Sequence, residues 1–295
     1  MMKLKYSILA FLDRHPLIKG ILYFPFRKSF PVFLEYHPKP KPRYGHGLPP
    51  HQRLYEIVNK NREVYKNYLN LFLKNQEQLL QVPKNGKSRS SSPYWINGWL
   101  PGLDAVAIYG FLSHHNPKRY FEIGSGNSTK FARQAIKDHT LQTQMTSIDP
   151  TPRAEIDSLC DNVIRRPLED VNLEIFSQLE AGDMLFVDSS HRSFMNSDVT
   201  VLFLEILHEL KPGILVEFHD ILIPYDYPQL WSGRFYSEQY LLATYLLASD
   251  RFEVVFPAAF INEDKDLKEI LTPFWSEPRM SGVERHGGSF WIKLI

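Results

Sequence analysis

The sequence is poor in the features that mark several classes of protein. It has a single cysteine, Cys160, which excludes an internal disulfide framework and favours a reducing compartment, the cytoplasm. Its formal net charge is only +1, so the basic excess of a nucleic-acid-binding protein is missing and we expect no nucleic acid partner. It has no apolar run of about 18 residues, so no transmembrane helix is expected.

Residues 1–33 also lack the clean apolar stretch and small-residue cleavage site of a signal peptide. Instead they interleave basic residues, such as Lys3 and Arg14, with aromatic residues, such as Tyr6 and Phe26. Two interpretations stay open. The segment is an arm that packs on the domain or on a second subunit of a homo-oligomer, or it is a helix that makes a peripheral contact with a membrane surface.

The rest of the chain suggests a division into residues 1–50, an arm with a Pro-rich connector, residues 51–92, a helical segment and loop, and residues 93–295, an α/β domain. Apolar residues at three-four spacing over Gln52–Val82 predict one or two helices. Strands then alternate with helices, which is typical of a doubly wound, mostly parallel sheet. We expect the last two strands to be joined by a loop. The strands are expected at residues 119–123, 144–149, 162–166, 183–189, 213–219, 252–257 and 289–295.

The most informative segment runs from Arg119 to Lys130 (RYFEIGSGNSTK) and predicts a buried strand, a tight turn and a helix start. Gly124 and Gly126 allow the backbone to turn sharply and to approach a ligand closely. Ser128 or Thr129 is expected to cap the helix. Free amide groups at such a turn favour an anionic or hydrogen-bonding ligand.

A second apolar strand ends in Asp149, whose carboxylate can accept hydrogen bonds from both hydroxyls of a ribose. A dinucleotide site prefers Gly-x-Gly-x-x-Gly, but the third glycine position here is Thr129. The pattern from Glu122 to Ser128 instead resembles motif I of class I S-adenosylmethionine-dependent methyltransferases. Those proteins usually carry a third glycine where this chain has Ser128.

The resemblance extends over roughly residues 93–295. The segments PGLD ending at Asp104, SIDPTPR ending at Arg153, VDSSH ending at His191 and FHD ending at Asp220 are similar to the bacterial type 24 methyltransferase domain group. This resemblance implies a Rossmann-like, seven-stranded sheet whose seventh strand inserts antiparallel between the fifth and sixth. It also implies S-adenosyl-L-methionine as the cofactor.

The resemblance assigns roles to individual residues. Glu122 is expected to meet the ammonium of the cofactor, directly or through water, and Asp149 to hold its ribose. Leu168 is expected to pack on the adenine and Glu169 to accept from its amino group, although Glu169 also suits a helix N-terminus without any ligand. The expected cofactor-binding residues are Glu122, Gly124, Ser125, Gly126, Asn127, Ser128, Asp149, Leu168 and Glu169.

Four ionisable residues, Asp188, His191, His219 and Asp220, lie at the ends of the fourth and fifth strands. Neighbouring parallel strands end at the same edge of a sheet, so we expect these side chains to converge where the methyl group is presented. Asp188, His191 and His219 are the candidate catalytic residues. In one mechanism, His191 or His219 is a general base that takes the proton of a substrate hydroxyl.

In the other mechanism, Asp188, His219 and Asp220 hold a divalent cation, magnesium or manganese, that binds the substrate oxygens. Related magnesium-dependent O-methyltransferases carry a carboxylate where this chain has His219, and an imidazole shifts preference away from magnesium. Adjacent residues of a strand point in opposite directions, so His219 and Asp220 can both take part only if the strand has already ended.

The segment Ile223–Tyr236 is rich in aromatic residues and follows the fifth strand directly. We expect Tyr225, Tyr227, Trp231 and Arg234 to form a lid on the substrate, with the aromatic rings stacking on a planar or sugar face. The alternative is a loop that packs against the N-terminal helices.

Together these features predict a cytoplasmic class I S-adenosylmethionine-dependent methyltransferase that acts on an oxygen of a small-molecule or glycan acceptor. Two alternatives remain. One is a nicotinamide-dependent oxidoreductase, against which Thr129 and the ionisable residues argue. The other is a non-catalytic Rossmann-like binding protein, against which the intact pattern of Glu122, Gly124, Gly126 and Asp149 argues.

Overall fold

The computed structural model describes residue 18, residues 34–87 and residues 90–295. Apart from residue 18, the N-terminal arm therefore lies outside the described residues, and both interpretations of it stay predictions. The described part of the connector, residues 34–51, contains no helix or strand, as expected for a Pro-rich segment.

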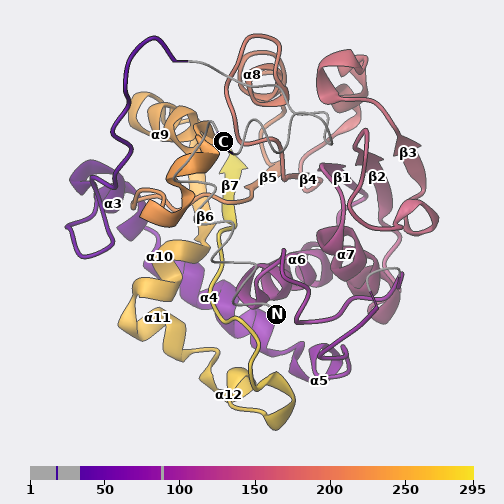
Figure 1. Ribbon diagram of the computed structural model, residues 1–295. Helices are drawn as coiled ribbons and strands as arrows, with labels where there is room; N and C mark the ends of the chain where they lie inside the picture. Colours follow the sequence, from indigo (N-terminus) through magenta and orange to yellow (C-terminus); the bar gives the residue numbers. More distant parts are fainter. Residues whose placement is uncertain (1–17, 19–33, 88–89) are drawn as a thin grey trace.

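Seven strands form one sheet in the order β3-β2-β1-β4-β5-β7-β6 (Figure 1). The first five strands are parallel, and β7 is antiparallel to both of its neighbours. All seven predicted strands and the inserted seventh strand are confirmed. The strands are β1 Arg119–Ile123, β2 Gln144–Ile148, β3 Asn162–Ile164, β4 Met184–Val187, β5 Leu215–Phe218, β6 Phe252–Pro257 and β7 Phe290–Leu294.

Helices cover both faces of the sheet. The α-helices are α3 Gln52–Asn59, α4 Arg62–Leu73, α5 Gln76–Leu79, α6 Gly102–His115, α7 Asn127–Asp138, α8 Asp198–Val201 (continued by the π-helical turn η4 Leu202–Ile206), α9 Glu238–Ala248, α10 Ala258–Glu263, α11 Lys265–Glu269 and α12 Thr272–Trp275. The short 3-10 helices are η1 Asp157–Leu159, η2 Leu168–Asp170, η3 Leu173–Gln178, η5 Gln229–Arg234 and η6 Pro278–Met280.

Two expectations about the helices were wrong. The segment 52–82 forms three helices, and α3 and α4 are separated at Asn61, whose side-chain amide donates to the carbonyl of Val254 (2.9 Å). The connection from β6 to β7 is not a plain loop, because it carries α10, α11 and α12. These helices are too short to show a helical repeat in the sequence, and buried side chains such as Phe274 and Trp275 hold them on the core.

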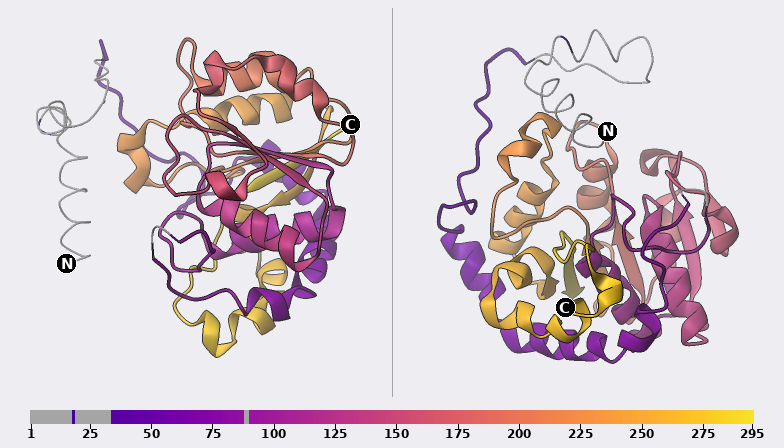
Figure 2. Two further views of the ribbon diagram at one scale, coloured as in Figure 1. Left: turned by 90° about the vertical axis from the view of Figure 1, so that its right-hand side faces the viewer. Right: turned by 60° about the horizontal axis from the view of Figure 1, so that its bottom comes forward.

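The three layers are visible in Figure 2. On one face, Trp291 of β7 stacks on Phe111 of α6, with ring centroids 4.2 Å apart. On the other face, Phe218 of β5 packs on Phe203 of η4 at 5.5 Å. The helices before residue 93 share this core, since Phe72 of α4 lies 5.1 Å from Phe111. The helices before residue 93 therefore pack into the same hydrophobic core as the α/β domain, on both sides of the domain boundary expected near residue 92.

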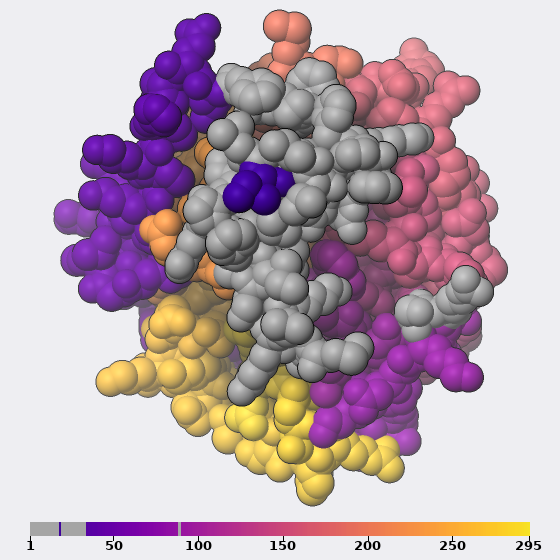
Figure 3. All heavy atoms as spheres, in the orientation of Figure 1, coloured from indigo at the N-terminus to yellow at the C-terminus, as the bar shows by residue number. Residues whose placement is uncertain are grey.

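The two edges of the sheet are far apart in the molecule. The edge strands are β3 and β6, and helix α3 lies against β6. Figure 3 shows residues 34–60, which include α3, in indigo on one side of the molecule and the surface around β3, in pink, on the opposite side. The strand order reverses between β1 and β4, at the carboxyl ends of these two strands. This reversal is where an open α/β sheet binds its ligands.

Candidate active site

The turn after β1 is shaped by a close approach of two chain segments. Gly124 has φ +76°, a conformation that favours glycine, and a Cβ added there would lie 2.0 Å from the backbone oxygen of Asp188. The turn therefore lies directly against the end of β4. At Gly126, by contrast, an added Cβ would meet no atom of the described residues within 4 Å, so those residues leave space in front of the loop.

Hydrogen bonds inside the protein occupy three amides of this loop. The amide of Gly124 donates to the carbonyl of Ile148 (2.9 Å), and that of Ser125 donates to Asp149 (2.8 Å). The amide of Gly126 donates to the hydroxyl of Thr129 (3.0 Å). Of the loop amides predicted to bind a ligand, this leaves those of Asn127 and Ser128, the first two residues of α7.

The helix after the loop begins earlier than the expected caps. Helix α7 starts at Asn127, so Ser128 and Thr129 lie in its first turn, and Thr129 reaches back to the Gly126 amide. Its hydroxyl also donates to the Glu122 carboxylate. The position that a dinucleotide site gives to glycine is therefore occupied by a buried threonine with two hydrogen-bonding roles.

The two predicted acids of the cofactor site differ in environment. Glu122 is buried and also accepts from the hydroxyl of Tyr120 (3.3 Å). Burial raises the pKa of Glu122 to about 7, although the hydroxyls of Ser128 and Thr129 partly oppose this shift. Asp149 is half-buried and is fixed by the amides of Ser125 (2.8 Å) and Thr151 (2.7 Å), which orients its carboxylate before any ligand arrives.

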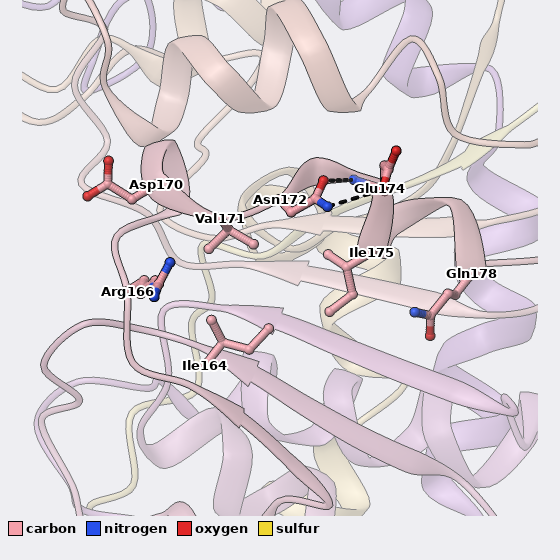
Figure 4. Close-up of a pocket in the computed structure, with 8 residues that line it drawn as sticks. All are labelled: Ile164, Arg166, Asp170, Val171, Asn172, Glu174, Ile175 and Gln178. Carbon is pink, nitrogen blue, oxygen red and sulfur yellow. Dashed lines mark hydrogen bonds between the residues drawn. The ribbon is translucent and has the colours of Figure 1, made fainter.

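The predicted adenine contacts lie in η2, after β3. Leu168 is buried and Glu169 is half-buried, and no ligand contact tests their predicted roles. A surface pocket of about 430 Å³ lies beside them, between β3 and η3, but neither residue lines it (Figure 4). The pocket is lined by Ile164, Arg166, Asp170, Val171, Asn172, Glu174, Ile175 and Gln178.

The loop before α6 covers the start of α7. The side-chain amide of Asn127 donates to Asn97 (3.3 Å), which ties this loop to the glycine turn. Arg153, four residues after Asp149, lies over the ring of Trp99 at 4.5 Å.

The structure brings together the four ionisable residues that follow β4 and β5. The Nε2 atom of His191 lies 3.1 Å from Asp188 Oδ1 and 3.6 Å from Asp220 Oδ2. The Nδ1 atom of His219 lies 3.9 Å from Asp188 Oδ1 and 3.7 Å from Asp220 Oδ1. We call these four residues the strand-end cluster.

The sequence analysis did not predict that two further acids contact the histidines of the strand-end cluster. Glu238, in the first turn of α9, accepts from His191 Nδ1 (2.8 Å), and Asp104, in the first turn of α6, lies 3.2 Å from His219 Nε2. Both carboxylates are fully buried. The signal for Asp104 was an acid inside the apolar run LDAVAI, whereas Glu238 looked like an ordinary acid at a helix start.

These acids decide the charge of the histidines. Burial opposes the charged form of His191, but hydrogen bonds to Asp188 and Glu238 outweigh it and raise the pKa of His191 well above its usual value. For His219, burial is likewise outweighed by Asp104 and by the charges of Asp188 and Asp220, so its pKa is also well above the usual value. These upward pKa shifts favour the imidazolium form of both rings, which does not suit the role of a neutral imidazole base.

The acids of the strand-end cluster are the groups that a ligand can reach. The side chains of Asp188 and Asp220 are 32% and 22% exposed, whereas those of His191 and His219 are about 5% exposed or less. Burial opposes ionisation of Asp188, but the two histidines outweigh it and lower its pKa to about 2. Asp188 thus presents a permanent carboxylate at the end of β4.

The condition for His219 and Asp220 to act together is met. Strand β5 ends at Phe218, and Asp220 has φ +55°, in the left-handed region that non-glycine residues rarely adopt. The chain therefore turns at this point, so that His219 faces Asp188 while Asp220 faces the rings of both histidines. His191 has φ +61°, so the second histidine of the cluster also sits on an unusual backbone turn.

The donor set does not fit a divalent cation. The Nε2 atom of His219 is directed at Asp104, and both ring nitrogens of His191 face carboxylates. Over residues 34–87 and 90–295, no group of three or more His, Cys, Asp or Glu side chains is arranged to hold a metal ion. The metal-assisted mechanism therefore has no support from the geometry.

Three of the four predicted lid residues come together. Trp231 packs on Tyr227 with centroids 5.8 Å apart, and the guanidinium of Arg234 lies over Trp231 at 4.2 Å. The fourth residue, Tyr225, lies apart, because it packs against Gly45 of the connector. Tyr236, which was not singled out, joins the group and lies 4.6 Å from the ring of His191.

The fold and site define a class of protein. A seven-stranded sheet with an antiparallel seventh strand between β5 and β6, a glycine turn after β1 and an acid after β2 form a Rossmann-like methyltransferase fold. Residues 121–221 match the family model of a methyltransferase domain, the type 24 group. The resemblance stated from the sequence is confirmed for this segment, which runs from β1 to just beyond Asp220.

Individual proteins are only distantly similar to this chain. A protein of Archaeoglobus fulgidus, described as uncharacterized, is 29% identical over 128 residues, which are 41% of this chain and 54% of that protein. The chain thus spans about half the length of the curated relative that it matches.

Solved structures with some similarity are methyltransferases. The SAH-bound methyltransferase PaMTH1 of Podospora anserina is 13% identical, covers 83% of this chain and 94% of its own, and has a TM-score of 0.39. The O-methyltransferase of Bacillus cereus in complex with SAH is 11% identical over 83% and 96%, with a TM-score of 0.37. These scores are low, so the fold assignment rests on the sheet topology.

Proposed function

We propose that the chain is an S-adenosylmethionine-dependent methyltransferase that acts on an oxygen atom of a small-molecule or glycan acceptor. One observation carries the proposal. The turn at Gly124 lies against the backbone oxygen of Asp188, so the loop expected to bind the cofactor adjoins the exposed carboxylate of the strand-end cluster. A methyl donor on the loop would thus present its methyl group beside Asp188.

The residues present fit the cofactor. The described residues leave space at Gly126, Asp149 is already oriented by two amides, and α7 begins directly after Gly126, where its first amides suit an anionic group. Glu122 would meet the ammonium in its ionised form. When bound, the cofactor would supply a sulfonium methyl group for transfer to the acceptor oxygen, and the electron pair of the broken carbon–sulfur bond would stay on sulfur.

The chain itself handles the proton of the acceptor. An oxygen that is being alkylated becomes strongly acidic, so a weakly basic carboxylate such as Asp188 is enough to take its proton. The imidazolium groups of His191 and His219 hold that carboxylate in place and keep it ionised. In this proposal the predicted catalytic histidines position Asp188 instead of acting as bases, and most of the catalysis comes from orientation.

The proposal also covers the setting of the reaction. The single Cys160 suits the cytoplasm. In the described part of the chain, no helix has the length and apolar character needed to span a membrane.

Calorimetry with the purified chain tests the proposal. S-adenosylmethionine and its demethylated product should bind with equal stoichiometry, and NAD should not bind. Transfer of a radiolabelled methyl group to oxygen acceptors should then be lost in Asp188→Asn. Binding of NAD alone would instead establish the oxidoreductase alternative.

A further inference from the structure

Two arginines stand over one aromatic ring at the entrance to the strand-end cluster. The guanidinium carbons of Arg192 and Arg234 lie 5.1 Å and 5.4 Å from the ring centroid of Tyr236. That ring packs on His191, and Arg234 also covers Trp231 at 4.2 Å. Two positive side chains therefore lie against one aromatic ring, which is itself in contact with the strand-end cluster.

The backbone fixes the position of Arg192. Its Nε donates to the carbonyl of Arg234 (2.8 Å), and its Nη1 donates to the carbonyl of Ser190 (3.0 Å). Both acceptors are neutral carbonyls, and among the described residues no carboxylate forms an ion pair with Arg192. The guanidinium is thus oriented by the protein while its charge is left for another partner.

Arg234 is only weakly compensated. Its Nη1 lies 4.0 Å from Asp220, beyond hydrogen-bond distance, and its side chain is 44% exposed. The same Asp220 carboxylate also faces His191 at 3.6 Å and His219 at 3.7 Å. One acid is therefore shared by three cationic groups, and the arginine pair carries positive charge that the described residues leave unmatched.

We propose that the acceptor carries an oxyanion, a carboxylate or a phosphate, that Arg192 and Arg234 bind at the entrance to the site. This inference rests on the proposed methyltransferase function. A guanidinium offers parallel N–H donors that match the oxygens of a carboxylate or phosphate. Binding of such an anion would explain why two positively charged side chains lie over the same ring. The adjoining rings of Trp231 and Tyr227 suit the ring of such an acceptor.

The oxyanion is not the carboxylate of the cofactor itself. That group is expected at the first turn of α7, beside Gly126. The arginines belong instead to the segments that follow β4 and β5, where they lie over the ring of Tyr236, which packs on His191 of the strand-end cluster. In this proposal they bind the acceptor and not the cofactor.

Matched probes test this inference in the full chain saturated with S-adenosylhomocysteine. Glucuronate is compared with glucose, benzoate with benzyl alcohol, and glucose phosphate distinguishes a phosphate from a carboxylate. Ligand-observed NMR titration should show that the anionic member of at least one pair binds at least about tenfold more tightly. Arg192→Gln and Arg234→Gln should each remove this preference, whereas Arg251→Gln, at the start of β6 and bonded to the carbonyl of His208, should keep it.

The outcomes separate the inference from the proposed function. Equal binding within every pair, or a preference that survives both arginine variants, overturns the oxyanion assignment. Affinity for S-adenosylhomocysteine is measured in the same samples and should stay within about twofold in all three variants. Failure of the wild-type chain to bind S-adenosylhomocysteine would instead overturn the methyltransferase proposal, whatever the probes show.

Discussion

The glycine turn and the strand-end cluster adjoin each other but are built in opposite ways. The turn holds its groups with backbone amides and hydroxyls, and its hydrogen bonds join residues at most 30 positions apart, such as Ser125 and Asp149 or Asn127 and Asn97. The cluster gathers acids and histidines from segments as distant as Asp104 and Glu238. Its parts depend on mutual charge balance, so loss of one partner leaves another charge buried and unpaired. The turn should therefore govern affinity, and the cluster should govern turnover and stability.

The largest effect is expected from Asp188→Asn, which removes the proton acceptor of the cluster. We expect kcat to fall by about 100- to 10,000-fold, the range typical of general acid–base groups, with unchanged affinity for S-adenosylhomocysteine. Single-turnover kinetics and calorimetry measure the two quantities. The exposed Asp157, which pairs with Arg165, provides the control variant Asp157→Asn. Retained turnover in Asp188→Asn would show that the cluster is not the reaction centre.

Glu238→Gln should have the next largest effect, because it removes one of the two carboxylates that hold His191. We expect kcat to fall less than in Asp188→Asn, and the free energy of unfolding to fall by about 3 kcal/mol, since a charged partner stays buried. Urea denaturation measures stability, and Glu209→Gln is the control because Glu209 contacts His208 on the surface. If Glu238→Gln and this control had the same free energy of unfolding, the buried ion pair between Glu238 and His191 would contribute nothing to stability.

Asp149→Ala tests the role of the glycine turn separately from that of the strand-end cluster. Binding of S-adenosylmethionine should weaken by about 1–3 kcal/mol, because the ribose hydroxyls lose a charged partner. At saturating cofactor, kcat should change little. Calorimetry and a saturation curve separate the two effects. Unaltered affinity would contradict the assignment of Asp149.

The pH dependence of the free energy of unfolding tests the ionisation of Glu122. Its pKa is raised from 4.5 to about 7 in the folded chain, so the folded state binds this proton more tightly than the unfolded state does. Its stabilising contribution is therefore full below pH 4.5 and is lost as the pH rises through about 7. Over that window the wild type should lose up to about 3 kcal/mol relative to Glu122→Gln. Parallel stability curves for the two proteins would show that Glu122 does not titrate in this range.

The smallest expected effect is that of a chelator. Because the nitrogens of His191 and His219 face carboxylates, we expect turnover to be unchanged after dialysis against EDTA and after addition of manganese. Activity that disappears with EDTA and returns with manganese would restore the metal-assisted mechanism and would show that the cluster rearranges on binding.

The sequence predicted the features that depend on local pattern. Apolar runs located all seven strands, and the turn at Gly124 followed from its neighbours. The convergence of Asp188, His191, His219 and Asp220 also followed, because parallel strands end at one edge. Such patterns are carried by short segments, which is why they can be read without a structure.

The partners of these residues could not be predicted in the same way. Nothing in the sequence around His191 indicates that Glu238 lies on its second nitrogen, so its protonated state was missed and a neutral base was expected. Tyr225 and Tyr236 have similar local contexts, yet packing against Gly45 takes Tyr225 away while Tyr236 joins the site. Only the tertiary packing separates such cases.

The position of β7 has a consequence for how the molecule assembles. Residues 290–293 pair with residues 215–218, and β6 reaches the sheet only through β7. The sheet is therefore completed only when two segments some 75 residues apart in the chain, β5 and β7, pair with each other. This pairing is slow to form, because the long intervening chain must first bring the two strands together. Until that contact is made, β5 is an open edge able to pair with another chain. Refolding should thus be most prone to aggregation before β7 is inserted.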